Sequence, residues 1–405
     1  MKTVYLDHAA TTPPDDEVLS LMFPYFSGRY GNPSSMHTSG RRAAQALAQA
    51  RERAAQTINA SPDEIIFTGS GTESDNLAVI GAARANQSRG KHVIISTIEH
   101  KAVLESARTL ERAGFEVSVA PVDAQGMIDV ASILSLVRDD TTLISIMFAN
   151  NEIGTVMPIS ELSKTLSERR KKTGLPLIHT DACQAAGHFA LDVKELGIDL
   201  MTLNGSKVYG PKGVGLLYKK EGTKLSPVIV GGGQENDLRA GTESLPLIMG
   251  MAFALEKAER IREEESVRLT ELREYFISRL ETEIPGIIIN GHPKHFLPHI
   301  VHVTVPSVEG ESMVLMLDEA GVETATGSAC SAKDLRPSHV LTATGQNDEL
   351  IHGSVRFSFG RGTTREELDY ALSVFRPIVE KLKGASALTT NYYAKEKRLA
   401  CPTRP

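Results

Sequence analysis

The sequence has little cysteine and neither a long apolar run nor an excess of positive charge. Its three cysteines, Cys183, Cys330 and Cys401, lie far apart with no C-x-x-C pair, which excludes a disulfide framework and a structural zinc site. This cysteine content is still compatible with a single reactive thiol. No apolar run approaches the roughly 18 residues of a membrane helix. The net charge of −6 argues against non-specific binding to nucleic acid or to anionic membranes.

The chain also lacks internal repeats, low-complexity tracts and a leader-like beginning. Residues 1–7 pass almost at once into a strand-like pattern, so we expect no signal or transit peptide and a cytoplasmic protein. What is present is ordinary. The 405 residues, 41% hydrophobic and 23% charged, are typical of a soluble globular protein with room for two domains and a large core.

Short apolar runs alternate with helical patterns through the first part of the sequence. Most runs lack polar alternation, which indicates strands buried on both faces of a largely parallel sheet. The predicted strands are 65–67, 93–96, 117–120, 143–148, 177–180, 200–203 and 214–218, and the predicted helices are 39–59, 100–113, 129–137 and 159–172. We therefore predict an α/β fold with a doubly wound, mostly parallel seven-stranded sheet, in which ligands bind at the carboxyl ends of the strands.

A smaller α+β domain is predicted after a long helical run at 247–283, which stops at Pro285 and Gly286. Its strands are expected near 287–289, 300–305 and 355–358, and its closing helix at about 364–382. We assign residues 15–258 to the large domain and residues 1–14 with 259–384 to the small one. Residues 385–405 show no periodicity and are expected to form a mobile tail.

Lys207 lies in a glycine-rich bend between two predicted strands, in residues 199–215. The glycines suit a tight turn and a close approach of the backbone. A lysine that projects from a strand end into a cleft can form a Schiff base with a carbonyl cofactor. From this stretch alone a surface lysine in a hairpin is favoured, and Lys212 is placed equally well.

Polar residues also follow other predicted strands. Gly71 and Thr72 begin a helix, where backbone N–H groups and a hydroxyl suit a phosphate, although a plain helix cap explains them equally well. His100 is either a capped or core residue or a ring that stacks on an aromatic cofactor. Asn150 and Asn151 follow the predicted strand 143–148 and are expected at the same sheet edge, although a plain loop explains them equally well.

Asp181 follows the predicted strand 177–180 and would be costly to bury without a partner. A protonated pyridine nitrogen of a cofactor is one such partner. His179 lies two residues earlier on the same face of the strand, so a metal held by His179 and Asp181 is an alternative. Cys183 is better explained as a small buried hydrophobic side chain.

The glycine-rich residues 231–242 include Arg239 and end at Thr242, and they form either a flexible connector or a second phosphate contact. Cys330 lies among small residues at 326–333, which suits a reactive thiol that must move, or an incidental loop cysteine.

Arg356 and Arg361 lie on a predicted strand and at its end. A guanidinium group binds a carboxylate through two parallel hydrogen bonds. One of the two arginines could instead hold the domain interface.

Taken together, these segments resemble a cysteine desulfurase of the NifS/IscS type, within the class V aminotransferases of the pyridoxal-phosphate (PLP) fold type I. The resemblance runs in order over nearly the whole chain, from residues 5–12 (YLDHAATT) through 31–34 (GNPS) to 360–364 (GRGTT). It is specific because each motif above falls at its family position. It implies an enzyme that uses pyridoxal 5′-phosphate to convert L-cysteine to L-alanine, supplying sulfur for iron–sulfur clusters or tRNA thiolation.

The resemblance assigns a role to each candidate. Lys207 would form the Schiff base with PLP and act as the acid/base at the substrate Cα. Around the cofactor, the implied contacts are the phosphate for Gly71 and Thr72, the ring face for His100, the pyridine nitrogen for Asp181 and the phenolic oxygen for Gln184. Substrate binding falls to Asn151 and Arg356, and Cys330 would take the sulfur as a persulfide. Thr242 would reach the phosphate of the neighbouring subunit, which implies a homodimer, and residues 331–337 resemble the longer loop that hands sulfur to a scaffold protein.

The sequence departs from the family beside Lys207, where Asn204 and Ser206 replace the usual serine and histidine that contact the phosphate. Ser206 still offers a hydrogen-bond donor. Two alternatives to the desulfurase follow. One is a related lyase or transaminase, for instance for selenocysteine, against which Cys330 argues. The other is a sulfur-relay scaffold with weakened cofactor binding.

Overall fold

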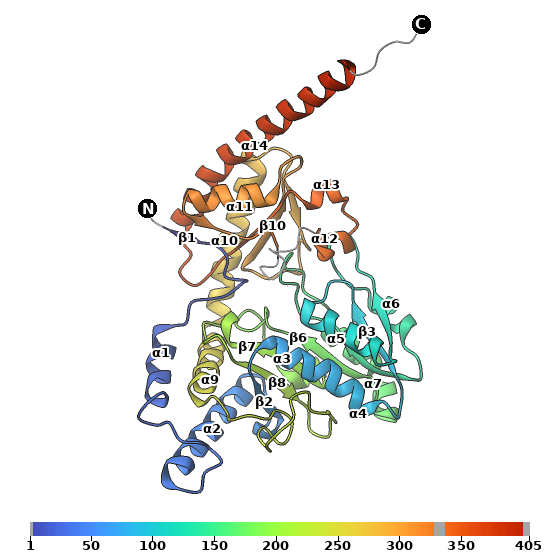
Figure 1. Ribbon diagram of the computed structural model, residues 1–405, viewed down its shortest axis with the longest axis vertical. Helices are drawn as coiled ribbons and strands as arrows, with labels where there is room; N and C mark the ends of the chain where they lie inside the picture. Colours follow the sequence, from blue (N-terminus) through green and yellow to red (C-terminus); the bar gives the residue numbers. More distant parts are fainter. Residues whose placement is uncertain (1–2, 328–336, 400–405) are drawn as a thin grey trace.

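A computed structural model of the chain describes residues 3–327 and 337–399. Two lobes make up the molecule, and each contains its own main sheet (Figure 1). The large lobe has a seven-stranded sheet with the helices packed on it, and the small lobe has a three-stranded sheet, a two-stranded sheet and the C-terminal helix.

The large sheet has the strand order β2-β8-β7-β6-β5-β3-β4. Neighbouring strands are parallel except for the two pairs that β8 makes, with β7 and with β2. The predicted seven-stranded, mostly parallel sheet is therefore confirmed. The strands are β2 (Ile65–Thr68), β3 (His92–Ser96), β4 (Glu116–Ala120), β5 (Thr141–Ser145), β6 (Leu177–Asp181), β7 (Leu200–Asn204) and β8 (Gly215–Lys219).

The large sheet packs against a hydrophobic core on each face. Successive side chains of a strand point to opposite faces, so neighbouring residues belong to different cores. Ile66 and Ile95 belong to one core, and their neighbours Phe67 and Ile94 belong to the other. One face is covered by α3 (Gly71–Asn76), the π-helical η3 (Leu77–Gly81), α4 (Ala82–Asn86) and α5 (Lys101–Arg112). The other is covered by α2 (Thr38–Thr57), α6 (Val130–Leu136), α7 (Ile159–Thr173), α8 (Val193–Leu196) and α9 (Leu245–Arg260).

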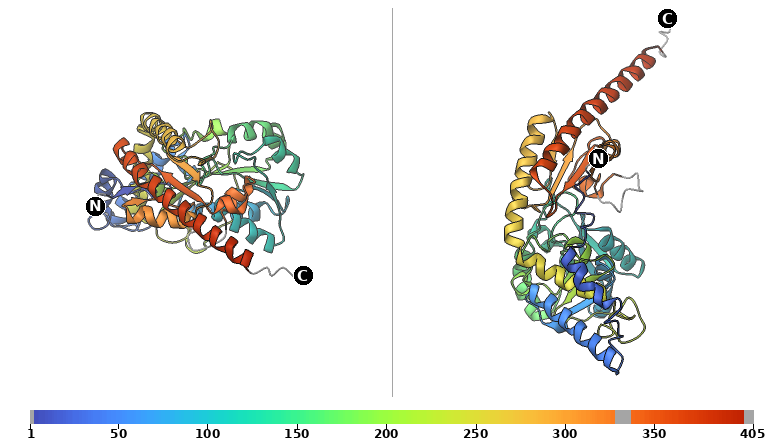
Figure 2. Two further views of the ribbon diagram at one scale, coloured as in Figure 1. Left: turned by 90° about the horizontal axis from the view of Figure 1, so that it is seen from above. Right: turned by 90° about the vertical axis from the view of Figure 1, so that its left-hand side faces the viewer.

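The small lobe is built on the antiparallel sheet β12-β10-β9 and the parallel pair β1-β11. Phe276 of α10, Phe357 of β12 and Phe375 of α14 meet edge to face in its core. Its elements are β1 (Val4–Tyr5), α10 (Arg262–Glu283), β9 (Ile288–Asn290), β10 (Ile300–Thr304), α11 (Gly310–Glu319), β11 (Val322–Glu323), α12 (His339–Ala343), α13 (Asp348–Ile351), β12 (Ser354–Ser358) and α14 (Arg365–Leu399). Figure 2 shows α10 along one side and α14 running on beyond the lobe.

Two helical predictions differ from the structure. The run predicted at 247–283 is divided at Ile261 into α9 and α10, and the closing helix continues to Leu399 instead of ending at 382. The predicted domain boundaries stay a prediction. In the part of the chain that the structure describes, no helix combines the length and the apolar character that crossing a membrane would require.

Candidate active site

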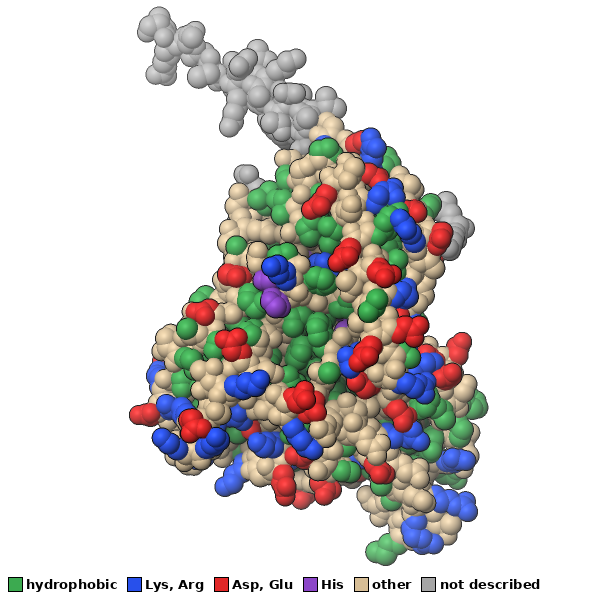
Figure 3. Space-filling model, turned by 180° about the vertical axis from the view of Figure 1, so that it is seen from behind, with side chains coloured by type: hydrophobic (Ala, Val, Ile, Leu, Met, Phe, Trp, Pro, Cys, Tyr) green, Lys and Arg blue, Asp and Glu red, His purple; other side chains and the backbone are tan. Residues whose placement is uncertain are grey.

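The predicted site residues meet at one edge of the large sheet. Strands β3, β5, β6 and β7 are parallel, so their carboxyl ends lie at the same edge. Asp181 ends β6, and the other three residues follow the ends of β3, β5 and β7: His100, Asn150 and Lys207. This edge faces the small lobe, since Arg356 of β12 donates to the Asn151 carbonyl oxygen at 2.7 Å. From behind, histidine and hydrophobic side chains gather where the two lobes meet (Figure 3).

Lys207 ends the short 3-10 helix η4 (Gly205–Lys207) and turns toward the N-terminal segment. Its Nζ donates to the carbonyl oxygens of Ala9 (2.7 Å) and Ala10 (2.6 Å). The same segment holds the backbone of the bend, because Thr12 Oγ1 donates to the Ser206 carbonyl oxygen and accepts from Tyr209 N. Lys207 is half-buried whereas Lys212 is exposed, so the structure separates the two lysines.

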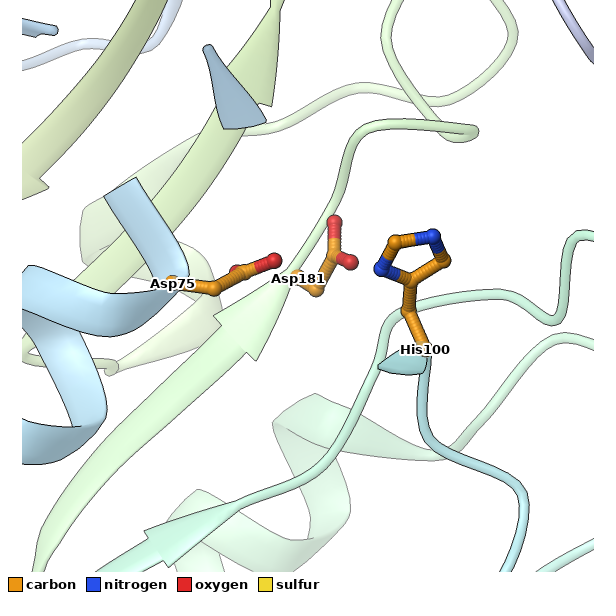
Figure 4. A group of neighbouring side chains, drawn as sticks. All are labelled: Asp75, His100 and Asp181. Atoms are coloured by element: carbon orange, nitrogen blue, oxygen red, sulfur yellow. The ribbon is translucent and has the colours of Figure 1, made fainter. Parts of the chain in front are cut away.

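Asp181 lies in a group with Asp75 and His100, shown in Figure 4. One ligand atom of each residue lies within 4.8 Å of the others. Asp75 is 1% exposed and its Oδ1 has no hydrogen-bond partner among the described residues. Burial, and then the neighbouring Asp181 carboxylate, raise the pKa of Asp75 well above its usual value. Burial and the neighbouring carboxylate therefore favour the neutral, protonated form of Asp75.

The structure contradicts the alternative in which His179 and Asp181 hold a metal, because His179 has no ring nitrogen left for it. Both ring nitrogens of His179 are already engaged, Nδ1 with Ser145 Oγ at 2.8 Å and Nε2 with Thr202 Oγ1 at 3.0 Å. Burial lowers the pKa of His179 to about 4, so the ring is neutral. His179 is a buried polar residue that links β5, β6 and β7.

The start of α3 lies beside the bend that carries Lys207. Ser70 caps the helix by accepting from Glu73 N at 3.1 Å, and Thr72 is exposed. A Cβ atom on Gly71 would lie 2.9 Å from Cys183 Sγ and 3.3 Å from the Asn204 Cβ, so only glycine allows this approach. Asn204 Oδ1 accepts from Ser206 N at 3.3 Å.

In the loop of residues 231–242, Arg239 is not free to bind a phosphate. Its guanidinium pairs with the Glu73 carboxylate at 2.8 Å. Thr242 is exposed at the end of the same loop. The contact of Thr242 with a neighbouring subunit stays a prediction.

Arg356 is 1% exposed and bridges the two lobes. Besides the Asn151 carbonyl oxygen, it contacts Asp7 Oδ1 at 2.8 Å, while its Nε has no partner among the described residues. Arg361 holds the interface instead: it pairs with Asp15 and stacks 4.1 Å from the Tyr209 ring. Arg356 is therefore the better placed of the two for a carboxylate.

Cys330 and Cys401 lie outside the described residues. The described residues on either side of the Cys330 segment meet at Glu152, which accepts from Ser338 Oγ at 2.6 Å and lies 3.1 Å from a Cβ built on Gly327. Cys183 is half-buried, and its backbone N–H donates to Asp181 Oδ1 at 3.0 Å.

Sequence reasoning missed two acids at this edge, Asp75 and Glu99. Glu99 is completely buried, Met147 N donates to its Oε1, and burial raises its pKa to about 8. A signal was available, since Glu99 directly precedes His100 after strand β3. An acidic residue directly after a strand usually lies exposed in a loop, and the sequence alone does not reveal that Glu99 is buried.

The fold and the lysine-bearing site define a PLP-dependent enzyme of fold type I. The chain belongs to the aminotransferase class-V family, whose model matches residues 4–371. It is similar to a protein named cysteine desulfurase IscS of Dictyoglomus turgidum, 48% identical over 98% of this chain and 99% of the relative. A solved NifS-like protein superposes with a TM-score of 0.87 at 36% identity, covering 94% of this chain and 100% of its own. The structure of SspA in complex with cysteine matches with a TM-score of 0.75 at 35% identity, over 88% and 99% of the two chains.

The residues at the edge fit PLP. The site offers an amine for the aldehyde at Lys207, a carboxyl group for the ring nitrogen at Asp181, and an imidazole beside that carboxyl group at His100. Asn204 and Ser206 lie beside the start of α3, where backbone N–H groups suit a phosphate.

Proposed function

We propose that the protein is a cysteine desulfurase that converts L-cysteine to L-alanine and keeps the sulfur as a persulfide on Cys330. The observation that carries this proposal is the meeting of Lys207, Asp181 and His100 at one sheet edge, with Arg356 reaching in from the small lobe. The names of the relatives support it over a selenocysteine lyase or a scaffold without cofactor.

Each group at the edge has a task that its surroundings suit. PLP, when bound, supplies an electron sink for the bonds broken at the substrate Cα. Lys207 Nζ moves the proton at that carbon. Arg356 binds the substrate carboxylate together with Asn151. Its Nε is buried, has no partner among the described residues and is available to donate a further hydrogen bond.

The sulfur step balances with the Cys330 thiol alone. The Cys330 sulfur bonds to the substrate sulfur as the substrate's Cβ–S bond breaks. The Cβ carbon takes the electron pair and a proton, so that cysteine and a thiol become alanine and a persulfide.

The proposed enzyme is a cytoplasmic homodimer that passes sulfur to an acceptor protein, for which an iron–sulfur scaffold is proposed. Cys183 is a free thiol, which suits a reducing compartment. Hydrophobic side chains are exposed near the end of α1 (Asp16–Met22) and in the loop that leads to Thr242, as at Phe23 (73%) and Val230 (78%). A second copy would cover them and bring Thr242 to the partner's phosphate.

The test is the amount of alanine and sulfide released from L-cysteine in the presence of a reducing thiol. The wild type is expected to release both in equal amounts. Cys330→Ser should lose the release of both products and the gain of one sulfur atom that mass spectrometry detects on the protein. Cys401→Ser is the matched control and should keep them. Full alanine production by Cys330→Ser would overturn the persulfide mechanism.

A further inference from the structure

Two histidines from different lobes stack beside the active-site edge. The rings of His188, which follows β6, and His299, which precedes β10, lie 4.1 Å apart between centroids with 16° between their planes. His299 is 4% exposed. Backbone hydrogen bonds hold both residues in place. Ser266 Oγ donates to the His188 carbonyl oxygen, and Phe359 N donates to the His299 carbonyl oxygen.

The His299 ring also contacts Gln184 of the large lobe. Gln184 Nε2 donates to the Ala9 carbonyl oxygen at 2.9 Å, so its Oε1 is the end that faces His299 Nε2, 3.4 Å away. An amide oxygen only accepts, and His299 must therefore carry its proton on Nε2. The ring's Nδ1 has no partner among the described residues, which agrees with an unprotonated nitrogen.

The surroundings of His299 keep the ring neutral. Burial lowers the pKa of His299 well below its usual value, and the charged and titratable groups that face the ring, His188, His8, Arg356 and Lys207, act in the same direction. A neutral imidazole has a single N–H to give. In this structure the Gln184 amide oxygen receives it.

The Gln184 amide and the Lys207 amine share one acceptor. Ala9 O accepts from Gln184 Nε2 at 2.9 Å and from Lys207 Nζ at 2.7 Å, so the two donors end beside each other. A buried amide held at one end only could turn its oxygen toward Lys207. The contact with His299 opposes that rotation.

We propose that His299 is a positioning residue, which fixes the Gln184 amide so that its NH₂ group, and not its oxygen, lies beside Lys207. The inference rests on the proposed function, because it gives Gln184 the role of donor to the cofactor's phenolic oxygen. A donor there would stabilise the anionic oxygen when PLP is bound, and the nitrogen joining Lys207 to the cofactor would then bind its proton less tightly.

The experiment titrates the visible absorption band of the PLP-loaded protein against pH and also measures the dissociation constant of PLP. His299→Phe keeps an aromatic ring for the stack and removes the N–H. Its titration midpoint should rise by about one pH unit, a tenfold change in proton binding. His299→Gln, which restores an N–H donor, should recover most of the shift. His188→Phe keeps the stack without touching Gln184 and should titrate like the wild type.

A double variant separates positioning from a general structural effect. In a Gln184→Leu background, His299→Phe should cause no further shift, because the amide that it positions is gone. A His299→Phe protein that loads PLP and keeps the wild-type midpoint would overturn the positioning role and leave the proposed function standing. Equal shifts in His299→Phe and His188→Phe, or a further shift in the Gln184→Leu background, would also overturn it. A wild type that shows no visible band with PLP would instead remove the proposed function.

Discussion

Asp75 and Asp181 form a pair of neighbouring carboxyl groups at the active-site edge (Figure 4). Two carboxylates at this distance in a buried place repel each other, and Asp75 is the more deeply buried. The surroundings of Asp75 therefore favour its protonated, neutral form. A neutral Asp75 places no second charge beside Asp181, the residue proposed to pair with the pyridine nitrogen of PLP.

Substitutions at the two positions should have unequal effects. Asp75→Asn replaces a neutral carboxyl group with a neutral amide of the same shape, so its dissociation constant for PLP should stay within about threefold of the wild type. Asp181→Asn replaces the acid that would pair with the pyridine nitrogen and should weaken PLP binding by about tenfold or more. Fluorescence titration of the apo protein with PLP measures both. Equal losses in the two variants would contradict the assignment of the proton to Asp75.

Buried neutral histidines make the protein sensitive to acid. Burial lowers the pKa of His302 to about 3 and that of His179 to about 4. Since these values lie below the unfolded value near 6.5, the stability that each ring contributes is complete above pH 6.5. It is lost as the pH falls toward the folded value.

His302→Asn tests the acid sensitivity. The Asn Oδ1 can take the place of the His302 Nδ1, which lies 2.9 Å from Asn290 Nδ2, while the titrating ring is removed. Between pH 6.5 and pH 4 the free energy of unfolding of the variant should fall less than that of the wild type, by on the order of 2 kcal/mol. Urea unfolding at several pH values gives the comparison. Parallel curves for the two proteins would contradict the buried neutral ring.

At the scale of the elements, the sequence predicted what depends on local pattern. Most strands of the large sheet are buried along their length and were predicted from short apolar runs, whereas the edge strand β4 is partly exposed, with Val119 at 48%. The break between α9 and α10 at Ile261 has no such signal, since neither glycine nor proline lies there. The pairing of β1 with β11 joins Val4 to Val322, and no local pattern records a contact so distant in the sequence.

A buried ion pair, in addition to the pair between Arg239 and Glu73, anchors the loop of residues 231–242. Glu235 is 6% exposed and receives two hydrogen bonds from Arg51 of α2, at 2.8 and 2.9 Å, and one from Phe67 N of β2 at 3.0 Å. The loop that carries Thr242 is thus fastened to the large sheet through a buried carboxylate.

Loss of that anchor should be costly. Glu235→Ala removes the buried carboxylate that accepts from Arg51 and from a strand N–H, so the free energy of unfolding should drop by about 3 kcal/mol. The matched control is Glu256→Ala, which breaks the exposed pair between Arg53 and Glu256 on α2 and α9 and should cost less than about 1 kcal/mol. Guanidinium unfolding measures both. A Glu235→Ala protein as stable as the control would show that the pair does not anchor the loop.

At the scale of the whole molecule, the site is assembled by contacts that the sequence does not display. Lys207 meets Ala9 across 198 residues, and Arg356 meets Asp7 across 349. Sequence reasoning placed the residues at strand ends, but it needed the family resemblance to choose Lys207 over Lys212. The N-terminal segment, which holds both Lys207 and Arg356, was not predicted to do so, because backbone carbonyl groups have no sequence signature.

The proposed homodimer gives a prediction about mass in solution. Light scattering should report twice the mass of one chain for the wild type. The double variant Phe23→Asp, Val230→Asp places charges on exposed hydrophobic positions of the large lobe and should shift the protein toward monomer. Leu315→Asp changes an equally exposed residue (66%) on α11 of the small lobe and should stay dimeric. A monomeric wild type would contradict the dimer.

The central claim is that Lys207 at the carboxyl edge of the large sheet binds PLP and that the loaded protein acts on L-cysteine. The most direct test is the visible absorption spectrum of the purified protein with PLP, before and after addition of L-cysteine. The account predicts a visible band that shifts with cysteine, is absent in Lys207→Ala and is unchanged in Lys212→Ala, a lysine of the same bend that is exposed. A protein that stays colourless with added PLP, or a Lys207→Ala variant that keeps the wild-type band, would contradict it.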